Sequence, residues 1–184
     1  MLQFTASWCS VCRREMPVIE DEIWKVNKDK EFVHFIDLPA RTNVPFQIAV
    51  NGPLDLLRAH GWSPVPAMDI SRTLNDYRAF IQDSWAEIGV AKHAYVTHRS
   101  GWFSDRTECY LAAGRPAIVQ DTGWSDHLPT GAGLIPFSTL DEAVEGIGRI
   151  EDAYAHHAAR AAEIAFDCFD ASQVLPLLLD KAAA

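Results

Sequence analysis

The stretch Arg106-Thr-Glu-Cys-Tyr-Leu-Ala-Ala-Gly-Arg-Pro-Ala-Ile-Val-Gln120 decides the fold class of this chain. Residues 106–113 have the composition of a helix, and the Gly114-Arg115-Pro116 turn ends it, because glycine suits a helix end and proline cannot continue the helix. Residues 117–120 then form a short apolar strand. A helix that leads through a tight turn into an apolar strand is one unit of a parallel α/β sheet.

The same alternation continues on both sides of this stretch. We expect strands at residues 46–50, 65–70 and 87–91, and helices at 54–60 and 74–84, with Gly61 as the cap of the first helix. Thr139-Leu-Asp-Glu142 is a capping box that opens a long helical region, which breaks near Phe169-Asp170. Residues 45–184 are therefore expected to form an α/β domain with a Rossmann-like parallel sheet flanked by helices.

The first forty residues differ from the remainder of the chain. We expect a strand at residues 2–6, a helix at 13–27 that Pro17 kinks, and a second strand at 31–38. Cys9 and Cys12 precede that helix, where its positive end and Arg13 favour the thiolate that attacks disulfides. Three of the five lysines lie between residues 25 and 30, and this shift in composition predicts a boundary near residue 40.

The order strand, Cys-x-x-Cys, helix, strand resembles the thioredoxin fold, in particular the TlpA- and ResA-type thiol-disulfide oxidoreductases. Trp8 before the cysteine pair and Pro17 after it match that family. The resemblance implies that Cys9 attacks, that Cys12 resolves the mixed disulfide, and that a protein disulfide is the partner. Pro66 is a candidate for the family's cis-proline. Half of a zinc site is disfavoured, because no second ligand pair of suitable spacing follows.

The stretch Ser100-Gly-Trp-Phe-Ser-Asp-Arg-Thr-Glu-Cys-Tyr-Leu-Ala-Ala-Gly-Arg-Pro-Ala-Ile-Val-Gln-Asp-Thr-Gly123 resembles the C-terminal, donor-binding half of a GT-B glycosyltransferase. That family has a loop, an acidic residue on a helix, Gly-x-Pro, an apolar strand and a glycine-containing loop in this order. The likeness extends over about residues 45–181. It implies that the chain binds a nucleotide sugar or a nucleoside diphosphate.

Two groups of residues are expected to contact that donor. Helix starts bind phosphates, and arginine pairs with them in a bidentate manner. A carboxylate such as Glu108 suits ribose hydroxyls, although the family's glutamate usually stands where Cys109 stands here. A loop that follows a strand binds ligands in open α/β sheets. The expected donor-binding residues are Ser104, Arg106, Glu108, Thr122, Gly123 and Ser125.

Five other residues are not expected to have a main role in binding or catalysis. His127 lies close to the expected donor loop, and His93 and His98 flank an expected strand edge at 95–96 without a role. Cys109 and Cys168 are expected to be small buried hydrophobic side chains.

Composition narrows the classes of function. The 184 residues carry a formal net charge of -9, which argues against a nucleic-acid binder. No apolar run is long enough to span a membrane, and no cofactor or metal site is expected. A glycosyltransferase-like chain would be cytoplasmic, and a redox protein would be extracytoplasmic.

Three functional hypotheses stay open at this stage. The first is a glycosyltransferase-like donor-binding domain, residues 45–184, which is incomplete for catalysis because residues 1–40 are too few for an acceptor domain. The second is a thiol-disulfide oxidoreductase, and the third is a non-catalytic α/β module. The chain is a fusion, an engineered or misassembled chimera, or one fold that joins both pieces in a single sheet.

Overall fold

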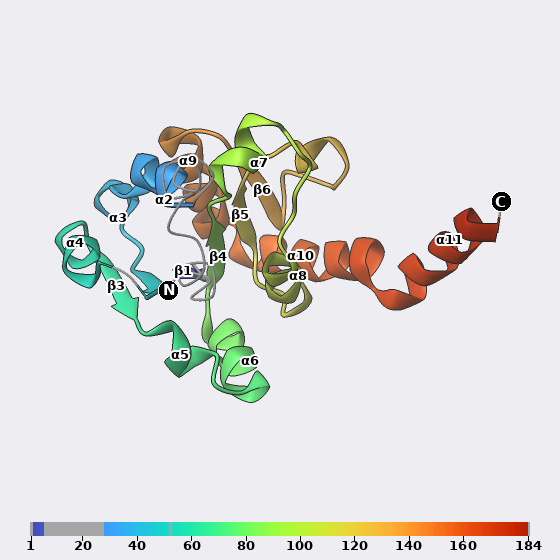
Figure 1. Cartoon of the computed structure of the whole chain (residues 1–184), viewed down its shortest axis with the longest axis horizontal. Coiled ribbons are helices and arrows are strands. Elements are labelled where there is room, and N and C mark those ends of the chain that lie inside the picture. Colours follow the sequence, from blue (N-terminus) through green and yellow to red (C-terminus); the bar gives the residue numbers. More distant parts are fainter. Residues whose placement is uncertain (1, 6–27, 52, 184) are drawn as a thin grey trace, which may run out of the picture.

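The computed structural model describes residues 2–5, 28–51 and 53–183 of the chain. Within these residues, parallel strands form a six-stranded sheet in the order β3-β2-β1-β4-β5-β6 (Figure 1). The strands are β1 (Leu2–Thr5), β2 (Phe46–Ala49), β3 (Trp62–Val65), β4 (Ala86–Gly89), β5 (Ala117–Gln120) and β6 (Leu134–Phe137). This strand order is that of the Rossmann fold. The expected Rossmann-like α/β fold is confirmed.

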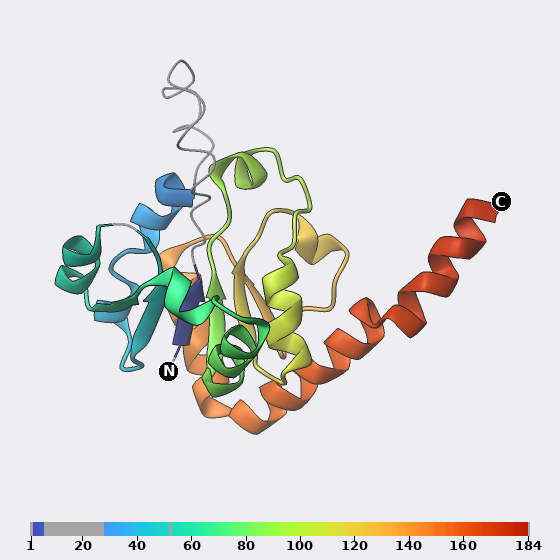
Figure 2. The ribbon, with the colours of Figure 1, turned by 60° about the horizontal axis from the view of Figure 1, so that its bottom comes forward.

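Helices connect the strands and cover both faces of the sheet. They are α2 (Lys28–Phe32), η2 (Val33–Phe35), α3 (Leu38–Arg41), α4 (Leu54–Ala59), α5 (Ala67–Ile70), α6 (Leu74–Asp83), α7 (His93–Thr97), α8 (Asp105–Ala112), η3 (Trp124–Asp126), α9 (Leu140–Asp152), α10 (Tyr154–Phe169) and α11 (Ala171–Ala183). The capping box at the start of α9 is present, and α10 ends at Phe169, as the sequence predicts. The last helix, α11, extends away from the body of the molecule (Figures 1 and 2).

Two apolar cores lie on opposite faces of the sheet. On one face, Ile118 of β5 packs with Ile147 of α9 and with Phe35 of η2. On the other face, Val119 packs with Leu111 of α8 and Ile164 of α10. Successive side chains of a strand point to opposite faces, so β5 contributes to both cores. Figure 2 shows α8 in front of the sheet and α9 behind it.

The stretch 31–38, expected to be a strand, is instead helical. It runs through the end of α2, η2 and the start of α3. Its buried residues are Glu31, Phe35 and Leu38, at positions i, i+4 and i+7, which is the spacing of one helix face. Packing of that face against the sheet overrides the apolar, β-branched composition that favours a strand.

The strand expected at 65–70 also differs in place and length. β3 comes earlier, at Trp62–Val65, and α5 occupies Ala67–Ile70. The buried Trp62 side chain fixes this register, because its Nε1 donates a hydrogen bond of 2.7 Å to the carbonyl of Ile36. Pro64 is tolerated in β3 because β3 is an edge strand. The peptide bond before Pro66 is trans.

Two smaller expectations are also wrong. The expected strand edge at 95–96 lies in helix α7. Cys109 is exposed, because the buried face of α8 is formed by Thr107, Tyr110 and Leu111. Cys168, expected to be buried, is only partly buried, where it packs against the core that contains Leu111 and Ile164.

Strand β1 lies inside the sheet rather than in a separate unit. It pairs with β2 over four residues and with β4 on its other side. The sheet is therefore continuous across the boundary expected near residue 40. The expected helix 13–27 and the Cys9–Cys12 pair lie outside the described residues. In the described part of the chain, no helix has the length and apolar character needed to cross a bilayer.

Candidate functional site

The strand order reverses direction between β1 and β4, which lie side by side at the centre of the sheet. The next strand after β1 is β2 on one side of this pair, and the next strand after β4 is β5 on the other side. In open α/β sheets, ligands bind outside the carboxyl ends of the strands at such a reversal of strand order. The candidate site is therefore the carboxyl edge of β4 and β5, formed by the segments 90–104 and 121–126.

The segment after β5 is organised by one carboxylate. Asp121 Oδ1 accepts hydrogen bonds from the backbone N–H of Gly123, at 2.9 Å, and of Ser125, at 3.4 Å. Its own N–H donates to the carbonyl of Phe137 in β6 at 2.8 Å. These contacts fold residues 121–126 into a compact turn, which ends in the short helix η3. The backbone N–H groups of Gly123 and Ser125, two of the expected donor-binding residues, are thus partnered within the turn.

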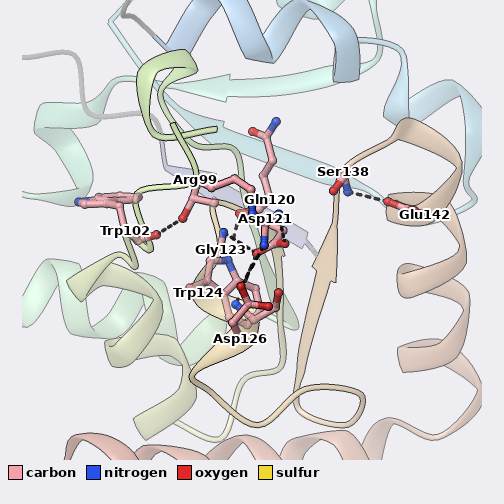
Figure 3. Close-up of polar contacts among 11 residues, drawn as sticks. Arg99, Trp102, Gln120, Asp121, Gly123, Trp124, Asp126, Ser138 and Glu142 are labelled. Carbon is pink, nitrogen blue, oxygen red and sulfur yellow. Dashed lines mark hydrogen bonds and ion pairs between the residues drawn. The ribbon is translucent and has the colours of Figure 1, made fainter. Parts of the chain in front are cut away.

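This turn is bound to the segment that precedes α8 (Figure 3). The Thr122 hydroxyl donates to the carbonyl of Trp102 at 2.7 Å, and the Gly101 N–H donates to the carbonyl of Thr122 at 2.8 Å. Gly123 has φ +95°, and a Cβ there would lie 3.1 Å from the Arg99 carbonyl. Glycine is therefore required at position 123 by both conformation and close approach.

Arg99 places a cation at this edge of the sheet. Its guanidinium donates to Asp126 at 3.1 Å and lies 3.5 Å from Asp121, and its side chain stays 58% exposed. Nearby, the rings of Tyr95 and Trp102 stack at 4.9 Å, and the Lys92 ammonium lies over the Tyr95 ring. The edge thus combines two cations with a half-buried aromatic pair.

No protein-family model and no curated protein sequence matches this chain.

The three expected residues around the start of α8 have distinct positions. Ser104 is the buried N-cap residue, and its carbonyl accepts the N–H of Glu108. Glu108 is half-buried, and burial together with the nearby Asp105 raises the pKa of its carboxyl. Arg106 points to the sheet, where its Nε donates to Oε1 of the fully buried Glu87 at 2.6 Å. A phosphate at Arg106 would have to replace Glu87 as its partner.

The three expected loop residues lie together in the turn after β5. Thr122 is fully buried, and its hydroxyl donates a hydrogen bond to the carbonyl of Trp102 instead of facing solvent. Phe103, which precedes Ser104, contacts the ring of Trp124 at 5.4 Å, so the turn and the start of α8 are neighbours. His127 is exposed and follows η3.

A second polar cluster lies at the same edge, on the face covered by α2. His93 Nδ1 lies 2.5 Å from Glu31 Oε1, and Gln120 Nε2 donates to Glu31 Oε2 at 2.6 Å. The backbone N–H of Ala91 donates to Gln120 Oε1 at 3.0 Å. This cluster, Glu31, His93 and Gln120, joins α2, α7 and the end of β5. In Figure 3 the side chain of Gln120 points away from the Asp121 turn.

The sequence reasoning missed Asp121, Arg99 and the Glu31–His93–Gln120 cluster. Asp121 had a usable signal, since it follows an apolar strand directly. Glu31 had none, because the stretch around it was expected to be a strand. Among the described residues, no group of three or more His, Cys, Asp or Glu side chains is arranged to hold a metal ion.

Proposed function

We propose that the carboxyl edge of this sheet binds the nucleoside diphosphate part of a nucleotide sugar, as the donor-binding half of a GT-B glycosyltransferase does. The observation that carries this proposal is the reversal of strand order between β1 and β4, with two interlocked segments standing at the carboxyl ends of β4 and β5. The carboxyl edge at such a reversal is the usual ligand site of doubly wound sheets.

Charge at the edge supports a diphosphate as the ligand. Arg99 is exposed, and its two contacts with carboxylates leave further N–H donors free for a phosphate. Exposed ion pairs of this kind are worth little, so a phosphate exchanges with them at small cost. Glu108 stands partly exposed on α8, and its carboxyl is a candidate to accept hydrogen bonds from the ribose hydroxyls.

Binding without efficient transfer is the expected behaviour of this chain alone. Sugar transfer needs donor and acceptor held together, because orientation supplies much of the rate. The described residues form one Rossmann-like sheet, with no second such sheet to hold an acceptor. We expect no transfer to any acceptor near ordinary enzyme turnover, roughly 1–10³ per second. An assay with labelled donor and a panel of sugar acceptors measures this.

Calorimetry with uridine and guanosine diphosphates tests the binding site. We expect millimolar or tighter binding by the full chain. Arg99→Ala removes a charge-assisted hydrogen bond worth about 1.5–3 kcal/mol and should weaken binding about tenfold or more.

The matched control is Arg160→Ala. Arg160 is a partly exposed arginine that pairs with one carboxylate, Glu163, and it adjoins Gly133 at the amino end of β6. Its loss should leave the dissociation constant unchanged. Equal losses for both variants, or no binding by the parent chain at millimolar ligand, would contradict the proposed site.

A further inference from the structure

The hydrogen bonds around His93 define which of its ring nitrogens carries the proton. The Ala91 N–H is a donor, so the Gln120 atom that faces it is the carbonyl oxygen, and the other Gln120 atom is the NH₂ group. That NH₂ donates to Glu31 Oε2, so Glu31 accepts there as a carboxylate. Glu31 Oε1 then accepts from His93 Nδ1–H. In the neutral ring, Nε2 is left with its lone pair.

The two sides of the His93 ring differ in access. Nδ1 faces Glu31, whose side chain is only 10% exposed, whereas the His93 side chain is 34% exposed. Nε2 has the Thr97 hydroxyl at 3.4 Å, a loose contact that a reactant can displace. A histidine can act as a general base when a carboxylate orients one ring nitrogen and the other ring nitrogen is accessible to a reactant. His93 has this arrangement.

We propose that His93 is the proton acceptor in a slow hydrolysis of the bound nucleotide sugar, with Glu31 and Gln120 as positioning residues. This inference rests on the proposed function, because it needs the donor at the carboxyl edge of the sheet. His93 follows β4 at that edge, and Gln120, the last residue of β5, precedes Asp121 of the candidate site. The Glu31–His93–Gln120 cluster thus lies at the same edge of the sheet, on the face covered by α2, and α7 carries both His93 and the Tyr95 ring that stacks on Trp102 of the candidate site.

In the reaction step, a water molecule attacks the anomeric carbon of the sugar. The new bond joins the water oxygen to that carbon, and the bond from the same carbon to the phosphate oxygen breaks. The electron pair of the broken bond leaves with the nucleoside diphosphate. The proton of the water passes to His93 Nε2, and the imidazolium is stabilised by the Glu31 carboxylate until it releases the proton to solvent.

The assay measures nucleoside diphosphate released by the full chain from UDP-glucose and from GDP-mannose, with calorimetry of the same samples. We expect His93→Ala to bind as the parent does and to release product about 100-fold more slowly. Added imidazole should restore part of the rate of His93→Ala. His156→Ala, which changes an exposed histidine of α10 outside the candidate site, is the matched control and should keep the parent rate.

Glu31→Gln tests the positioning role. It should lower kcat with little change in KM, and it should shift the ¹⁵N signals of His93 away from the Nδ1–H tautomer that the parent shows. If His93→Ala unfolds, His93→Gln provides the same comparison, with circular dichroism to verify the fold.

Each outcome bears on one of the two proposals. A parent chain that binds donor but releases no diphosphate would overturn the hydrolysis and leave the donor site standing. An unchanged rate in His93→Ala, or an Nε2–H tautomer in the parent, would overturn it as well. A parent chain that binds neither nucleotide sugar would overturn the donor site, and the hydrolysis with it.

Discussion

At the scale of single residues, the Glu87–Arg106 pair is the buried ion pair under α8. Glu87 is fully buried in β4, and the Arg106 side chain is only 10% exposed. Among the described residues, Glu87 Oε2 has no hydrogen-bond partner. The ion pair with Arg106 is therefore the main interaction that compensates the buried negative charge of Glu87. Removing one partner of a buried pair leaves an uncompensated charge in a poorly solvated place.

Arg106→Ala should therefore lower the free energy of unfolding by about 3–5 kcal/mol. Urea denaturation of the full chain measures this loss. The double variant Glu87→Met/Arg106→Met should recover most of the stability, because it removes both charges and keeps the volume. A double variant as unstable as Arg106→Ala would show that packing, rather than the unpaired charge, causes the loss.

Cysteine reactivity is a second prediction at this scale, and it tests the redox hypothesis. Cys109 is exposed as a residue, but partial burial of its thiol, together with the neighbouring Asp105 and Glu108, raises the pKa of that thiol. Burial also raises the pKa of the Cys168 thiol. Because the thiolate is the reacting species, both should alkylate slowly at mildly acidic pH. Cys9 should react well before them, and also before Cys12, if the Cys-x-x-Cys pattern is redox-active. Mass spectrometry after iodoacetamide treatment at pH 6 compares all four thiols, and equal labelling would contradict the redox hypothesis.

At the scale of elements, α10 packs directly on the turn before β6. A Cβ on Gly133 would lie 2.5 Å from the backbone nitrogen of Ala161, so glycine sets how closely α10 approaches the sheet. The N–H of Gly133 donates to Nδ1 of the buried His157 at 3.2 Å. That bond needs Nδ1 as an acceptor, which the protonated imidazolium does not provide.

Acid should therefore weaken the contact between α10 and β6. Burial, with Arg149 and His156 nearby, lowers the pKa of His157 below its ordinary value of 6.5. His157 therefore binds a proton more readily in the unfolded chain than in the folded one. Its contribution to the free energy of unfolding is complete above pH 6.5 and is lost as the pH falls below that value. Urea midpoints between pH 7.5 and pH 5 measure this loss. His157→Asn, which keeps an acceptor, should reduce the pH dependence, whereas the exposed His156→Asn should not. The same pH slope in both variants would contradict the assignment.

At the scale of the whole molecule, the described N-terminal residues, 2–5 and 28–41, belong to the same fold as residues 45–183. β1 is hydrogen-bonded to β2 on one side and β4 on the other, and so it joins the two halves of the sheet. Phe35 and Leu38 are buried in the larger core, and Arg41 pairs with Asp141 at the start of α9. A structure of residues 45–184 alone would leave two inner strands without their shared partner.

A chain shortened to residues 45–184 should therefore lose cooperative unfolding. Comparison of its thermal transition with that of the full chain, by circular dichroism and calorimetry, measures this. Addition of a separate peptide of residues 1–44 should restore part of the transition. A shortened chain that melts like the full chain would show that residues 45–184 form an independent domain.

The sequence by itself determined those elements whose causes are local. Residues 106–120 fold as expected because three residues, Gly114 to Pro116, encode the turn between α8 and β5. Helix α9 starts where expected because the side chains of Thr139 and Glu142 cap its first turn. The parallel α/β class follows from the alternation of such segments. The position of β1 between β2 and β4 could not be predicted in this way, because the residues of a short apolar strand do not specify which strands pair with it.

Only the tertiary structure decided the helical state of residues 31–38 and the partners of the charged groups. Glu31 meets His93 across 62 positions of the chain and Gln120 across 89, and Arg106 meets Glu87 rather than solvent. A buried carboxylate must find a donor, and which donor lies within reach depends on how strands and helices stack. Local sequence fixes the elements, because their hydrogen bonds and caps are local, whereas the candidate site depends on contacts between residues far apart in the chain.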